Sequence, residues 1–141
     1  MIYRIEKNSI GPYNYNFIFK DENYSISLWA EEGHRHRTMP LPSEDLILGK
    51  IYPFIQKTGD KFFNDIVFGF LNRNDFSKYF TNSELNKLND LGFQINEYKE
   101  DFFYKVLYGD SQCICFKTQD AYSYYLEIMQ EETKKGFIPF Y

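Results

Sequence analysis

The sequence has no long apolar run, and this absence argues against a protein that crosses a membrane. No stretch of about 18 consecutive apolar residues, the length that a spanning helix needs, occurs in the chain. Met1 is soon followed by the charged block Tyr3-Arg4-Ile5-Glu6 rather than by the apolar segment of a signal peptide. We therefore expect a soluble, cytoplasmic protein with no membrane partner.

Cysteine is scarce, with only two residues, Cys113 and Cys115. They lie two apart on a predicted strand, so their side chains share a face while their backbones diverge too far for easy disulfide geometry. Neither follows a helix start or a cationic neighbour that would activate a thiolate. The pair indicates strand packing in a reducing compartment.

The common catalytic motifs are also missing. The sequence contains no Gly-rich phosphate loop, no His-Glu-x-x-His, no Gly-x-Ser-x-Gly and no acidic triad. Classical hydrolase or nucleoside-triphosphatase chemistry is thus unsupported. We expect a binding protein rather than an enzyme, although the sequence leaves catalysis open.

Positive charge is not concentrated either. The 16 Lys and Arg are outnumbered by 20 Asp and Glu, for a net charge of −4. An acidic surface repels a phosphate backbone and gains nothing from counterion release. Nucleic acid is therefore not the expected partner.

Aromatic residues are abundant, with 15 Phe and 13 Tyr in 141 residues, whereas Ala and Val are scarce. The core must be built from large rings, some of which will remain on the surface. The length suits one domain, residues 1–141, with a single core.

The hydrophobic pattern predicts an α+β fold with a mostly antiparallel sheet and about three helices. Strands are expected at 3–5, 17–29 (a hairpin), 66–70, 93–98, 104–108 and 112–116. Helices are expected around 74–80, 83–91 and 120–135, and a poorly formed stretch at 46–55 is broken by Gly49 and Pro53. The hairpin around Gly109-Asp110 places Val106 and Tyr108 on one face, with the two cysteines on one face of the partner strand.

Two predicted elements carry clear apolar faces. Strand 66–70 is apolar on both faces, which predicts burial of Phe68 and Phe70. The C-terminal helix presents a stripe of apolar side chains that should pack against the core. The stripe consists of Tyr122, Tyr125, Leu126 and Met129.

Two polar or aromatic segments are candidate contact surfaces. His34-Arg35-His36-Arg37 has two histidines that could ligate zinc, but the flanking arginines repel a cation, so we predict no metal and interpret the segment as a solvated basic loop able to meet an acidic partner. The tail Phe137-Ile138-Pro139-Phe140-Tyr141 follows a helix stop, and it is either part of a crowded core or a contact surface.

Three spaced blocks resemble a family of small proteins encoded by bacteriophages and prophages. They are Tyr3-Arg4-Ile5-Glu6 with Gly11-Pro12-Tyr13, Phe68-Gly69-Phe70 with Tyr79-Phe80, and Gly109-Asp110-Ser111-Gln112 with Phe116. The resemblance covers roughly residues 3–117, so residues 117–141 form an addition to the core. It implies a viral origin and a place in the host cytoplasm.

A looser resemblance concerns ADP-ribosyltransferases, in which a first-strand Arg contacts NAD and a late-strand Glu or Gln assists at the ribose. By that resemblance Arg4, Tyr13 and Gln112 would bind NAD or another nucleotide. A simpler use of Arg4 is a cross-strand ion pair beside Glu6.

Two hypotheses follow. The first is a phage accessory protein that binds a host or viral protein, for example to inhibit a bacterial anti-phage defence system, through the basic loop and the tail residues Phe137, Phe140 and Tyr141. It needs no cofactor. The alternative is an ADP-ribosyltransferase-like protein or enzyme that uses NAD. Both leave a homo-oligomer open.

Overall fold

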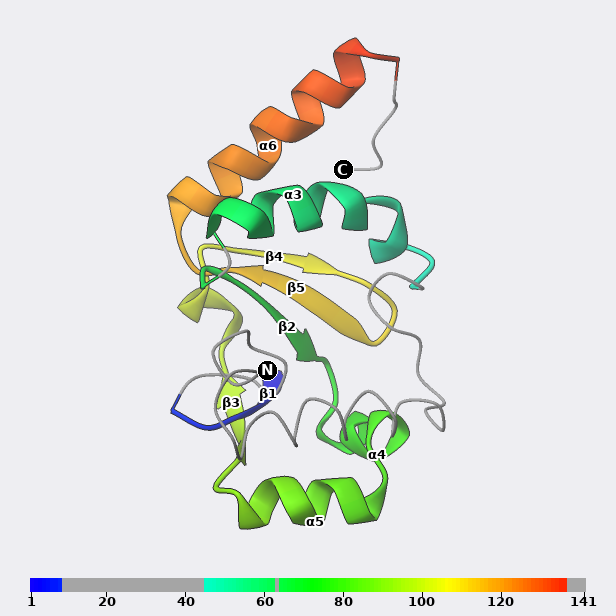
Figure 1. Ribbon diagram of the computed structural model, residues 1–141, viewed down its shortest axis with the longest axis vertical. Helices are drawn as coiled ribbons and strands as arrows, with labels where there is room; N and C mark the ends of the chain where they lie inside the picture. Colours follow the sequence, from blue (N-terminus) through cyan, green and yellow to red (C-terminus); the bar gives the residue numbers. More distant parts are fainter. Residues whose placement is uncertain (9–44, 63, 137–141) are drawn as a thin grey trace. The chain divides into compact units, whose positions relative to one another are not determined.

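A computed structural model describes residues 1–8, 45–62 and 64–136 of the chain (Figure 1). The chain divides into two compact units, residues 1–2, 40–71 and 98–141 in one, residues 3–39 and 72–97 in the other. We call them unit 1 and unit 2 and describe each by itself. The strands that pair and the helices around them confirm the predicted α+β class with antiparallel pairing and a C-terminal helix. The single domain over 1–141 stays a prediction.

Unit 1 is built on three neighbouring strands, with β5 in the middle. Its elements are η2 (Leu48–Lys50), α3 (Tyr52–Phe62), β2 (Ile66–Phe70), η4 (Glu100–Phe102), β4 (Lys105–Tyr108), β5 (Gln112–Phe116) and α6 (Gln119–Lys134). β5 pairs antiparallel with β2 on one side and with β4 on the other. In the register, Ile114 lies opposite both Phe68 and Leu107, and all five residues of β5 are buried.

One face of this sheet is covered by α3 and α6, which lie on the same side of it in Figure 1. Because side chains alternate along a strand, Ile114 and Phe116 of β5 point to that face. They pack in one buried cluster with Phe54 and Ile55 of α3 and with Tyr125 of α6.

The opposite face holds a second, smaller cluster. Cys113 and Cys115 point there with Val106 of β4, and Phe103 packs over them. Both cysteines are fully buried, neither forms a disulfide, and their sulfurs lie 3.7 Å apart. The register confirms the prediction that the two cysteines share one face of the sheet. Cys115 pairs with Val106 and Cys113 pairs with Tyr108 on the neighbouring strand.

Several expected elements of unit 1 are confirmed and one is wrong. The strand at 66–70, the hairpin around Gly109-Asp110 and the C-terminal helix all form. The helix expected to break at Pro53 instead begins at Tyr52 and runs to Phe62. Proline is tolerated there because an N–H group in the first turn of a helix has no acceptor within the helix, so its loss breaks no helical hydrogen bond.

Two predicted core positions are wrong. Phe68 is 37% exposed and Leu126 is 40% exposed. On α6 the buried stripe instead contains Ala121, Tyr125 and Met129 with Ile128, so Leu126 lies off its edge.

Unit 2 contains most of β1 (Ile2–Glu6) and β3 (Gln94–Tyr98), which are neighbouring strands. Its helical elements are η3 (Arg73–Asp75), α4 (Phe76–Tyr79) and α5 (Asn82–Asp90). Thr81 starts α5 with a capping box, in which the Thr81 hydroxyl accepts from the Glu84 N–H and the Glu84 carboxylate accepts from the Thr81 N–H. Gly92, at φ +95°, follows the end of α5, close to the end predicted for the helix at 83–91. The expected hairpin at 17–29 and the basic loop His34 to Arg37 lie outside the described residues.

A buried carboxylate joins the start of η2 to the β4–β5 turn in unit 1. Asp45 is 3% exposed, and its Oδ1 accepts from the N–H groups of Ile47 and Leu48 at 2.8 and 3.0 Å. Its Oδ2 accepts from the Asp110 N–H at 3.3 Å. The turn approaches so closely that a Cβ added at Gly109 would lie 2.7 Å from Oδ2 and 2.9 Å from Oδ1. Glycine is required here by space.

We predict that Gly109→Ala destabilises the protein, by about 1 to 3 kcal/mol, because the new methyl group must displace a hydrogen-bonded buried carboxylate. Gly59→Ala is the matched control, since Gly59 lies inside α3 with nothing within 4 Å of its added Cβ. It should be neutral or stabilise by up to about 1 kcal/mol. Urea unfolding measures both, and equal effects would contradict the close packing of the turn on Asp45.

Candidate partner-binding groove

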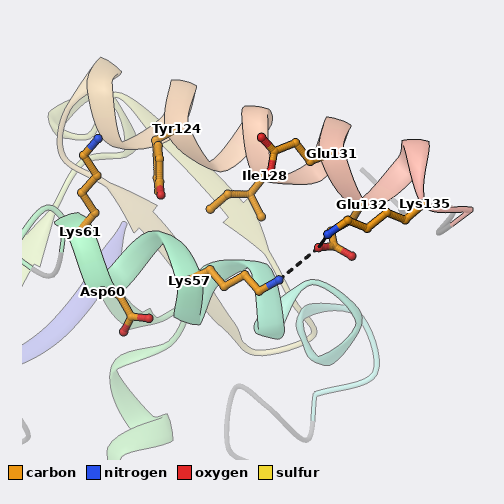
Figure 2. Close-up of a pocket in the computed structure, with 8 residues that line it drawn as sticks. All are labelled: Lys57, Asp60, Lys61, Tyr124, Ile128, Glu131, Glu132 and Lys135. Carbon is orange, nitrogen blue, oxygen red and sulfur yellow. Dashed lines mark hydrogen bonds and ion pairs between the residues drawn. The ribbon is translucent and has the colours of Figure 1, made fainter.

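A groove of about 500 Å³ runs between α3 and α6 in unit 1 (Figure 2). Three of its residues come from α3, four from the middle and end of α6, and one lies just beyond α6. They are Lys57, Asp60, Lys61, Tyr124, Ile128, Glu131, Glu132 and Lys135. The groove thus has a narrow apolar strip edged by charges of both signs.

The two helices are held together beneath the groove by apolar packing. Phe54 and Ile55 of α3 meet Tyr125 and Met129 of α6 in the main core cluster. The Thr58 hydroxyl, which is fully buried, donates to the Phe54 carbonyl at 2.7 Å, so this buried hydroxyl is satisfied within α3. The two helices that line the groove are therefore held in place by the buried cluster beneath it.

An ion-pair network bridges the helices at one end of the groove. Lys57 Nζ donates to Glu132 Oε1 at 3.1 Å, and Lys135 Nζ lies 3.6 Å from the same oxygen (Figure 2). The hydrogen bond from Lys57, with the positive charge of Lys135 beside it, holds the pKa of Glu132 below its ordinary 4.5. The carboxylate is the shared partner of two ammonium groups.

Aromatic contacts occupy the other end. Lys61 Nζ lies 4.7 Å from the ring centre of Tyr124 and 5.6 Å from that of Phe62, within the range of cation–π attraction. The Phe62 and Tyr124 rings are 5.5 Å apart and tilted. Lys61 is itself exposed, so its ammonium group is within reach of solvent or a partner.

The sequence prediction named none of the groove residues. Lys57 and Lys61 lie one turn apart on α3. This spacing puts them on one face only if residues 52–62 form a helix, and no helix was predicted over those residues. Lys57 and Glu132 are also 75 residues apart in the chain, so no local pattern links them.

The residues predicted to bind NAD are placed as follows. Arg4 is 9% exposed, and its Nε donates to Glu6 Oε2 at 2.8 Å. This ion pair lies along one strand, whereas the sequence predicted a cross-strand pair, and Asn96 of β3 donates to the other Glu6 oxygen at 2.9 Å. Gln112 is buried at the start of β5 in unit 1, whereas Arg4 belongs to unit 2. Tyr13 lies outside the described residues, and the ligand role of the three stays a prediction.

The predicted partner-binding segments also lie outside the described residues. These are His34, Arg35, His36 and Arg37, and the tail residues Phe137, Phe140 and Tyr141. The tail does begin directly after Gly136, one residue beyond Lys135 of the groove. Among the described residues, no group of three His, Cys, Asp or Glu side chains is placed to hold a metal ion.

The chain belongs to a family of bacteriophage proteins. The family model that it matches, over residues 1–128, is described as Bacteriophage T4 Y00F protein. This match confirms that the chain belongs to a phage protein family, whereas the sequence blocks on which the resemblance was based and the ADP-ribosyltransferase resemblance stay predictions. No curated protein and no solved structure matches the chain. In the described part of the chain, no helix has the length and apolar character of a membrane span.

The Glu132 network predicts a pH-dependent contribution to stability. A carboxyl whose pKa is lower in the folded state stabilises that state above its unfolded pKa, near 4.5 here, and the contribution is lost as the pH falls through the folded pKa. Glu132→Gln should therefore be less stable than the wild type at pH 7, and the difference should vanish in acid.

The matched control is Glu131→Gln, which removes the same charge one residue away. Thermal unfolding from pH 7 down to pH 3 compares the three proteins, and added salt should shrink the Glu132 effect because the pair is partly exposed. A Glu132→Gln difference that stayed constant with pH would mean that the carboxylate charge contributes nothing.

Proposed function

We propose that this phage protein acts as an accessory factor in the host cytoplasm by binding a host or viral protein, with the α3–α6 groove as part of the contact surface. The observation that carries the proposal is the make-up of the groove. An apolar strip of Tyr124 and Ile128 lies between the charged side chains of two helices. Membership of the bacteriophage family supports the biological setting.

Protein interfaces combine apolar or aromatic centres with a polar rim, and a few anchoring side chains supply most of the binding energy. Tyr124, partly buried and stacked under Lys61, is such a centre, and its ring is already ordered by Phe62. An ordered ring loses little conformational freedom on binding. The rim contains both charge signs, which favours a partner with a complementary charge pattern rather than a polyanion.

The aromatic tail fits the same proposal. The tail that contains Phe137, Phe140 and Tyr141 follows Gly136 in the sequence, and Gly136 is one residue beyond the groove residue Lys135. The tail and the basic loop His34 to Arg37 are proposed as further partner-contact segments. The proposed biological outcome is inhibition of a bacterial anti-phage defence system.

The test is affinity capture from infected bacteria with charge-matched variants. Tagged wild type, Lys61→Glu, a deletion of residues 137–141 and Lys99→Glu are compared by quantitative mass spectrometry. Lys99→Glu is the control, because Lys99 is exposed in unit 1 and does not line the groove. We expect one protein to be recovered by the wild type and by Lys99→Glu and to be reduced about tenfold or more with Lys61→Glu and the deletion.

Recovery of the same proteins by all four chains would contradict a role for the groove and the tail. The defence hypothesis is tested separately by plating phage on hosts that express the wild type or Lys61→Glu. The wild type, and not the variant, should raise the plating efficiency on hosts with the targeted defence system.

A further inference from the structure

β4 is an edge strand. It lies at one end of the strand order and pairs with β5 alone among the described strands (Figure 1). An edge strand presents backbone donors and acceptors that can pair with a further strand, and proteins usually guard such edges with charge or proline. The neighbourhood of β4 therefore indicates whether its edge is guarded or built for contact.

The hydrogen bonds of the hairpin show which residue of β4 faces outward. The Gly109 N–H donates to the Gln112 carbonyl at 2.8 Å, so Gly109 turns its backbone toward β5. In an antiparallel pair, residues alternate between facing the partner and facing away. Leu107 and Lys105 then face β5, whereas Val106 and Tyr108 turn their backbone groups away from it, and Val106 lies at the middle of the outward side.

The N-terminal end of β4 supports this assignment. Tyr104 N donates to the Phe116 carbonyl at 2.8 Å, although Phe116 is the register partner of Lys105. Two residues of one strand thus face one residue of the other, as in a β-bulge. Tyr104 and Lys105 both turn inward, which again leaves Val106 as the outward residue.

Large rings flank the edge. Phe102 is 62% exposed and Tyr104 is 50% exposed, both just before β4. Phe102 is positioned by ring contacts with Tyr98 and Phe103 at 4.9 and 5.2 Å. Exposed rings held in place beside an open strand are typical of an interface.

The lysine side chain of β4, which could protect the edge by its charge, points away from that edge. Lys105 is the only charged residue of β4, and its Nζ lies 5.9 Å from the ring centre of Tyr122 on α6. Its side chain is thus directed over the helix-covered face of the sheet rather than across the edge. No charge of β4 stands in front of Val106.

We propose that β4 pairs with β4 of a second copy of this chain, antiparallel and across a two-fold axis. In this arrangement Val106 lies opposite Val106 of the partner subunit, and the two exchange N–H···O bonds. The register places Lys105 opposite Leu107 of the partner subunit, so no two lysines face each other. Phe102 and Tyr104 cover both ends of the contact. A two-fold interface must be self-complementary, and this edge meets that requirement.

Sedimentation velocity of the purified chain, from about 1 to about 300 µM, tests the proposal. The wild type should form a dimer that dissociates on dilution. Val106→Pro removes the outward N–H without touching a β4–β5 hydrogen bond, and it should raise the dimer dissociation constant at least about tenfold. Far-UV circular dichroism checks that the fold is retained.

Phe102→Asp keeps the test decisive if the proline variant does not fold, and it should weaken the dimer similarly. Its control is Leu126→Asp, which places the same charge at another exposed apolar residue, on α6. A dimer that persists unchanged in both β4 variants, or that is weakened equally by Leu126→Asp, would overturn the proposal. A monomer at every concentration would also overturn it and would leave the edge to an extended segment of a different protein.

Discussion

The burial of β5 on both of its faces is the constraint on which unit 1 depends. A strand between two antiparallel neighbours has its backbone satisfied, and it must then find cover for side chains that point in two directions. Ile114 and Phe116 obtain cover from α3 and α6, whereas Cys113 and Cys115 obtain it from the segment that contains Phe103. All five residues of β5 are buried as a result.

This constraint places the surfaces that we consider functional. Because α3 and α6 cover the same face of the sheet, they lie beside each other and form the groove of Lys61, Tyr124 and Glu132. Because the other neighbour of β5 is the short strand β4, the described strands of the sheet end in an edge at Val106. The β4–β5 turn is packed on Asp45, which fixes the hairpin against the start of η2.

Much of the fold could be predicted from the sequence, because its signals are local. The apolar run at 66–70 and the turn at Gly109 specify β2 and the hairpin, and Gly92 and Gly136, both at positive φ, follow the ends of two helices. The errors arise where tertiary contacts decide. Gly49 and Pro53 led to the prediction of a broken stretch at 46–55, whereas α3 is stabilised by the packing of Phe54 and Ile55 rather than by helix propensity. The groove depends on residues 75 positions apart, such as Lys57 and Glu132, and no local pattern reveals it.

Paired unfolding measurements on Ile114→Ala and Leu126→Ala test the central role of β5 most directly. Both changes remove a branched aliphatic side chain of the same size, but Ile114 is fully buried and Leu126 is 40% exposed. We predict a loss of about 2 to 5 kcal/mol for Ile114→Ala and of less than about 1 kcal/mol for Leu126→Ala. Equal losses in the two variants would contradict the account, because β5 would then not be the strand on which the core is built.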